Sequence, residues 1–245
     1  MSTVLGVLGA ALVMMAVERW RPGRLWPKTP GWWPRCLALN VVQVTIALVA
    51  GASWDRWLPE LAVVSLARWG TLPGALAGYL VITFIYYWWH RARHESAPLW
   101  RWLHQVHHSP ARIEVLTSFY KHPLEITLNA VLSSAILYSG LGLTPAQGAL
   151  ALAFTGLAEL FYHWNVSTPY WLGFLFQRPE SHRVHHQRGR HRCNYSDLPL
   201  WDWLFGTLHN PRTFTADCGF DDQLERRLGT MLIGIDVHQR QEKST

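Results

Sequence analysis

Five apolar runs separated by basic stretches set the pattern of the chain. Each run approaches the roughly 20 residues that a helix needs to cross about 30 Å of hydrocarbon. The runs cover residues 3–17, 36–52, 72–89, 124–143 and 145–161. They predict an all-α integral membrane helical bundle with four to five spans. Buried helices of a soluble α protein are the alternative, but several of them would need more polar surface than this chain provides.

The first run is the shortest and decides the number of crossings. No basic residue precedes it and no convincing cleavage site of small residues follows it, which argues against a secretory signal peptide. We therefore expect it to be a membrane helix with Met1 outside and Thr245 in the cytoplasm. If the run lies in the membrane interface instead, four crossings remain and both ends are cytoplasmic.

The basic residues indicate the orientation of the bundle, because loops rich in Lys and Arg stay on the cytoplasmic side. With five spans and the N-terminus outside, Arg56 and Arg68 are the only two of the 22 Lys and Arg residues that lie outside. The net charge of +6 then reflects topology and anionic lipid head groups. A nucleic acid partner is not expected, since the sequence contains no recognition motif for one.

Histidines supply the candidate chemistry. Of the 13 histidines, eight form three clusters with helical spacing. The clusters are His90 with His94, then His104, His107 and His108, and finally His182, His185 and His186. Side chains three or four residues apart share one face of a helix, so two imidazoles of a cluster can bind the same ion. His107 and His108 are adjacent and diverge enough to serve two different ions. Eight histidines exceed the four to six ligands of one ion, and the clusters therefore predict a site for two metal ions.

Other metal sites fit the spacing less well. Cys36, Cys193 and Cys218 lie too far apart for a CxxC zinc site or a disulfide framework. A zincin protease needs HExxH, but Pro98 stands where the second histidine would follow His94. A carboxylate di-iron bundle is excluded because the clusters contain no Glu ligands. Nitrogen ligands suit iron, zinc or copper, and a position between cytoplasm and bilayer favours a metal that activates dioxygen against a lipid C–H bond.

The order of the motifs HRARH, HQVHHS, HPLE, HWN, HRVHH and NYSDLPLWDWLFGT resembles that of the fatty acid hydroxylase and sterol desaturase superfamily. The resemblance covers residues 86–207 and includes the apolar hairpin between the second and third clusters. It identifies the chain as a bacterial member of that family. The resemblance implies one membrane-embedded domain over residues 1–245 with a cytosolic, histidine-rich helical cap. It also implies a non-haem di-iron oxygenase of the inner membrane, whose active site faces the cytoplasm and whose ligands are the eight clustered histidines and His163.

The resemblance points to five further residues with lesser roles. His122 and Glu125 of the HPLE motif are expected to support the ligands or the fold rather than bind metal. Glu159 stands one turn before the HWN histidine, where some members of the family have a paired histidine, so the full ligand count stays open. His191 and Asn194 are candidates near the last cluster. The WDWLFG segment is expected either to close the cap or to take part in catalysis.

The implied reaction is the hydroxylation or desaturation of a membrane lipid with dioxygen and two electrons, hydroxylation being favoured. The chain contains no GxGxxG, CxxC or HPGG motif, so no bound haem or flavin is expected. A separate ferredoxin or b-type cytochrome with its reductase would supply the electrons. Two iron ions are expected, with zinc as the alternative in purified protein. The candidate substrates are fatty acyl chains, sterols or hopanoids, alkylglycerol ethers and carotenoids.

A metal-binding transporter or a zinc membrane protein without oxygenase activity is the competing hypothesis. A transporter places polar ligands near the middle of its spans. Residues 76–84, 128–136 and 149–155 contain no Asp, Glu, Lys, Arg or His. The sequence therefore favours the oxygenase.

Overall fold

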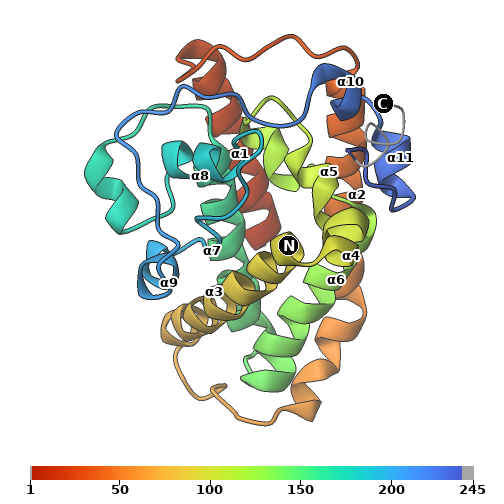
Figure 1. The fold of residues 1–245 in the computed structure, drawn as a ribbon. Coiled ribbons are helices and arrows are strands. Elements are labelled where there is room, and N and C mark those ends of the chain that lie inside the picture. Colours follow the sequence, from red (N-terminus) through yellow and green to blue (C-terminus); the bar gives the residue numbers. More distant parts are fainter. Residues whose placement is uncertain (1, 239–245) are drawn as a thin grey trace.

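Helices make up the regular structure of residues 2–238, the part of the chain that the computed structural model describes. Five long helical segments run side by side and form the body of the molecule (Figure 1). They are α1 (Ser2–Trp20), α2 (Trp32–Ala52), α3 (Thr71–Glu95), α6 (Pro123–Ser134) with its π-helical continuation η5 (Ala135–Gly140), and α7 (Pro145–His163). The predicted all-α bundle is confirmed.

Three helices of the bundle are long and apolar enough to cross a membrane. They are α1 from Thr3, α2 with its extension to Arg56, and α3. The predicted membrane bundle is confirmed, but fewer helices meet this criterion than the four to five spans expected. The α-helix of α6 ends after 12 residues, where the wider π-helix begins, and α7 carries the polar Glu159 and His163 near its end. That the hairpin formed by α6, η5 and α7 crosses the membrane stays a prediction.

Glycine allows α3 and α7 to approach each other closely. A Cβ atom added at Gly78 would lie 3.3 Å from Ala151 Cβ of α7 and 2.8 Å from Cδ1 of Leu143, which precedes α7. Small residues at such a position let helices in a membrane pack tightly. The packing aligns the end of α3, which carries His90 and His94, with the end of α7, which carries His163.

The hairpin helices begin at capping residues that the sequence supplies. Thr144 Oγ1 accepts a hydrogen bond from Gln147 N at 3.3 Å, and Gln147 Oε1 accepts one from Thr144 N at 2.8 Å. This reciprocal pair is a capping box at the start of α7. His122 Nδ1 accepts a hydrogen bond from Leu124 N at 3.0 Å and is the N-cap of α6. Both helices start with a proline after the cap, where its missing N–H costs nothing.

Short helices form a cap at one end of the bundle (Figure 1). They are α4 (Ala97–Leu99), η3 (Trp100–His104), α5 (Gln105–His108), η4 (Val115–Phe119), η6 (Tyr170–Phe174), α8 (Pro179–His185), α9 (Pro199–Leu204), α10 (Asp222–Glu225) and α11 (Leu228–Leu232). Two more, η1 (Trp54–Arg56) and η2 (Leu58–Leu61), connect α2 to α3 at the other end. A buried apolar cluster joins Trp32 and Cys36 of α2 to Val106, Tyr120 and Met231 of the cap. These apolar contacts hold the segment with His104, His107 and His108 beside the bundle.

Candidate metal centre

Four segments of the chain bring nine histidines together where the cap meets the bundle. They are His90 and His94 near the end of α3, His104, His107 and His108 in η3 and α5, His163 at the end of α7, and His182, His185 and His186 in or directly after α8. The three clusters of the sequence therefore meet in space, and the histidine of HWN joins them.

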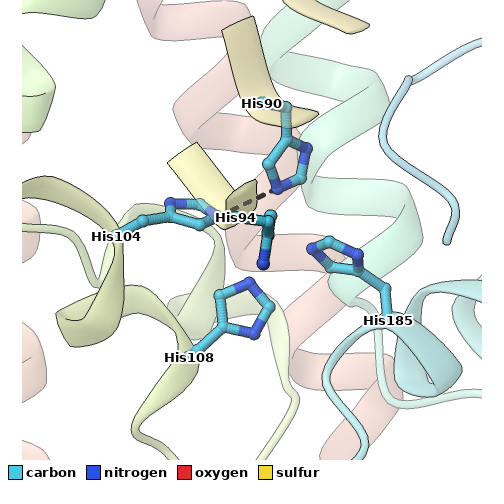
Figure 2. Close-up of side chains that lie close together, drawn as sticks. All are labelled: His90, His94, His104, His108 and His185. Carbon is cyan, nitrogen blue, oxygen red and sulfur yellow. Dashed lines mark hydrogen bonds between the residues drawn. The ribbon is translucent and has the colours of Figure 1, made fainter. Parts of the chain in front are cut away.

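The nine histidines divide into two groups, each compact enough to surround one ion. The first group contains His90, His94, His104, His108 and His185 (Figure 2). The second group contains His107, His163, His182 and His186. Within each group, one ring nitrogen of every member lies within 4.8 Å of those of the others. Five and four neutral nitrogen donors match the coordination numbers of divalent transition metals.

Consecutive histidines connect the two groups. His107 and His108 are neighbours in sequence, yet their rings belong to different groups, and the same holds for His185 and His186. Successive positions on a helix point in directions about 100° apart, which explains the division. The His108 and His186 rings stack with centroids 4.2 Å apart, so the two groups adjoin each other.

Five of the nine rings are oriented by a fixed acceptor at Nδ1. The acceptors are Tyr195 O at 2.7 Å for His90, Glu125 Oε1 at 3.0 Å for His104, Tyr120 O at 3.3 Å for His107, Glu159 O at 2.9 Å for His163 and Cys193 O at 2.6 Å for His185. A carbonyl or carboxylate oxygen accepts only, so in the neutral ring Nδ1 carries the proton. The lone pair of Nε2 is then free to point into the centre.

Lone pairs of neighbouring rings face each other inside the first group. His90 Nε2 lies 2.9 Å from His104 Nε2, and both rings hold their proton on Nδ1. Two lone pairs at this distance repel, whereas a cation beside them accepts both. Both buried ring nitrogens of His94 and His108, and the buried Nε2 of His185, have no hydrogen-bond partner. Unpaired buried nitrogens are costly, so the donor set fits a bound metal ion.

Burial keeps the cap histidines in the form that binds metal. It lowers the pKa of His185 to about 3. It likewise holds the pKa values of His107, His108, His182 and His186 well below the usual range, helped by repulsion from neighbouring rings. Metal ions bind neutral imidazole, so these rings need no deprotonation near neutral pH.

Two ion pairs, one buried and one partly buried, lie directly behind the histidines. Glu125, which accepts the hydrogen bond of His104, also pairs with Arg93. The Glu159 carboxylate pairs with Lys121. Sequence analysis identified both carboxylates but missed the two cations. The motifs offered a signal for them, because Arg93 is the second arginine of HRARH and Lys121 is the residue directly before HPLE.

The remaining sequence candidates lie outside both groups. His122 Nδ1 is occupied as the α6 cap, and its Nε2–H donates to Leu232 O at 3.1 Å, which is a structural role. The His191 ring centroid lies 4.9 Å from that of His108 at the edge of the centre. Asn194 adopts φ 57°, a left-handed conformation that asparagine tolerates better than most residues. Its side chain donates to Ser181 O at 2.8 Å.

The loop after the last cluster holds the first group in place through Asp202. Its buried carboxylate accepts hydrogen bonds from Tyr195 N at 2.8 Å, Ser196 N at 3.0 Å and Thr207 Oγ1 at 2.7 Å. Tyr195 in turn supplies the carbonyl that orients His90. The second Asp of the NYSDLPLWDWLFGT motif thus acts on the centre through the backbone of residue 195.

An open cavity of about 480 Å³ reaches the first group at His94. Its lining also includes Arg91, Glu95, Arg192 and Tyr195. A second cavity of about 390 Å³ adjoins His94 on the side of Trp100 and His191. The first group is therefore accessible from outside the protein.

The sequence model of the fatty acid hydroxylase family matches residues 75–207, more than half of the chain. An ornithine lipid hydroxylase of Rhizobium tropici is 29% identical over 198 residues, which are 75% of this chain and 59% of that protein. Human alkylglycerol monooxygenase is 35% identical over 138 residues, 54% of this chain and 30% of that protein. A Δ7-sterol-C5(6)-desaturase of Nicotiana tabacum is 31% identical over 169 residues, 64% of this chain and 58% of that protein.

The chain spans less than two thirds of the length of each of these relatives. No solved structure matches it. The matched region contains all nine histidines of the two groups, together with Arg93, Glu125 and Asp202. Sequence motifs, histidine geometry and family match agree, and the chain belongs to the fatty acid hydroxylase family.

Proposed function

We propose that the protein is a membrane oxygenase that holds two iron ions in the two histidine groups and oxidises a C–H bond of a membrane lipid. The convergence of nine histidine nitrogens, with facing lone pairs at His90 and His104, carries this proposal. When bound, the two irons would activate dioxygen and supply the oxidant for an unactivated C–H bond. Zinc is the alternative occupant of a protein purified without iron.

The protein's own residues would fix the ligands and tune the centre. Backbone carbonyls hold His90, His107, His163 and His185 in one tautomer, with Nε2 directed inward. Glu125 does the same for His104 with a carboxylate, which makes that imidazole a stronger donor. Burial of the second group excludes water from its ligands.

The position of the cavity supports a lipid substrate. It lies where the end of α3 meets the loop at Tyr195 and Thr207, so a substrate carried along α3 would arrive at His94. Relatives are named for hydroxylation of an ornithine lipid, oxygenation of an alkylglycerol and desaturation of a sterol. We propose hydroxylation rather than desaturation, with electrons from a separate ferredoxin or b-type cytochrome. The site would face the cytoplasm of a bacterial inner membrane.

Lipid analysis with isotopic oxygen tests the proposal. Membranes of cells with and without the protein are compared under ¹⁶O₂ and ¹⁸O₂, and hydroxylation adds about 16 or about 18 mass units to one lipid class. Desaturation removes about two mass units and incorporates no label. His238→Ala is the matched control, because His238 is exposed and outside both groups. Unchanged lipids, or oxidation of a water-soluble compound alone, would contradict the proposed function.

A further inference from the structure

An exposed apolar surface covers part of the cap outside the metal centre. It is formed by η6 with the two residues after it and by α9 with Phe205, two segments that contact each other. Its exposed members are Trp171, Phe174, Leu175, Phe176, Leu200, Trp203, Leu204 and Phe205. Trp203 is 67% exposed and Trp171 is 59% exposed. A contiguous apolar patch of this kind marks an interaction site.

This cap apolar surface continues a row of exposed side chains on α3. The row recurs at every fourth residue, so that neighbouring members lie one helical turn apart and the row winds slowly around α3, and it consists of Leu72, Leu76, Leu80, Phe84 and Trp88. The Phe205 ring centroid lies 4.7 Å from that of Trp88, and the Trp201 ring centroid lies 5.0 Å from that of Phe84. Figure 1 shows α9 next to α3, on the same side of the molecule as α8. Since α3 fits a membrane span, its exposed row faces acyl chains, and the cap apolar surface extends that face.

Basic residues border the cap apolar surface. The Arg91 guanidinium lies 5.6 Å from the centre of the Trp88 ring, and that of Arg212 lies 4.5 Å from the centre of the Tyr170 ring. Cations beside aromatic rings at the edge of an apolar surface are typical of the membrane interface, where they meet lipid phosphates. The positive charge at the border of the surface therefore complements the negative phosphates of the lipid head-group layer.

We infer that η6 and α9 are inserted into the bilayer leaflet at the cap end of the bundle, with the cap apolar surface in contact with acyl chains. This inference rests on exposure, continuity with α3 and the basic border, and it does not depend on the identity of the metal. Insertion of these segments would place lipid next to the cavity that reaches His94, because Thr207 in the cavity lining lies two residues after Phe205. A lipid at the inserted segments would then lie beside the route to His94.

Site-directed spin labelling of the full chain in phospholipid nanodiscs tests the insertion. Nitroxides are placed at Trp203→Cys and Phe174→Cys, and collisions with dioxygen and with a water-soluble nickel chelate are compared. Leu76→Cys on the α3 row is the acyl-chain reference, and the exposed Arg190→Cys is the water reference. The native residues Cys36, Cys193 and Cys218 are buried, so labelling is confined to the introduced thiol.

We expect both cap labels to collide with dioxygen in preference to the nickel chelate, as Leu76→Cys does and Arg190→Cys does not. A nickel preference like that of Arg190→Cys would place the surface in water and overturn the inference. Exclusion of both reagents would mean that protein, such as a second copy of the chain, covers the surface, and would also overturn it. Both replaced side chains are more than half exposed, and Leu204→Cys provides a second position on α9 should Trp203→Cys not fold.

Discussion

His90 Nε2 and His104 Nε2 face each other at 2.9 Å, although each ring holds its proton on the other nitrogen. The contact joins the C-terminal end of α3 to η3 in the cap. Without a cation the two lone pairs would repel, and with one they become ligands of the same ion.

Glu125→Gln should weaken metal binding and also lower stability, because the buried Arg93 guanidinium loses its counter-charge. The amide keeps the shape of the side chain but removes the charge that His104 Nδ1–H meets, and a change of this kind typically costs tenfold to a hundredfold in metal affinity or activity. Iron content and lipid oxidation of the purified variant measure the effect. Glu60→Gln, an exposed change at the opposite end of the bundle, serves as the control. Equal metal affinity in both variants would show that the carboxylate does not act on the centre.

His122→Ala should lower stability by about 1 kcal/mol through loss of the α6 cap and leave the metal content unchanged. Thermal unfolding and metal analysis separate these effects. His122→Asn restores a side chain that can accept the hydrogen bond of Leu124 N, so it should recover most of the lost stability. Loss of metal in both variants would identify His122 as a ligand and contradict the structural role.

Asp202→Asn should destabilise the loop that orients His90. The amide group cannot accept all three hydrogen bonds of the buried carboxylate, and an unsatisfied buried donor costs about 1–3 kcal/mol. The melting temperature should fall and iron should be lost from the first group. Asp217→Asn, whose side chain is 72% exposed, is the comparison. Identical melting and metal content in the two variants would exclude the positioning role of Asp202.

Acid should destabilise the metal-free protein. The pKa of His185 is about 3 in the folded chain, whereas an unfolded histidine titrates near pH 6.5. Between these values the unfolded chain binds more protons, so stability is complete above about pH 6.5 and falls by about 1.4 kcal/mol per pH unit for each such histidine. Melting in nanodiscs from about pH 8 to about pH 5 checks this sign. Constant melting over that range would mean that the imidazoles are not buried in neutral form.

Local spacing predicted much of the centre. The helical spacing of His104, His107 and His108 predicted that the last two would point toward different ions, and the structure places them in different groups. The resemblance added His163, which lies in the second group. These features depend on single helices or on short motifs, so the sequence contains the information for them.

Other features of the centre and of the fold depend on tertiary contacts and could not be predicted from the sequence. Nothing in the sequence assigns His185 to the group of His90 rather than to that of its near neighbour His182, because this depends on how α8 docks against α3. The motifs contain both Arg93 and Glu125, but the two residues lie on different helices, so the sequence does not show that they pair. The π-helix that follows α6 likewise reflects packing, since residues 124–143 read as one continuous apolar run.

Metal analysis of the protein purified without oxygen tests the central claim most directly. Wild-type protein and His238→Ala should each contain about two irons per chain, one for each histidine group. His185→Ala should lose iron from the first group, and the lipid product should disappear with it. A wild-type chain that binds no metal or a single ion, or a His185→Ala chain with the full wild-type content, would contradict the account.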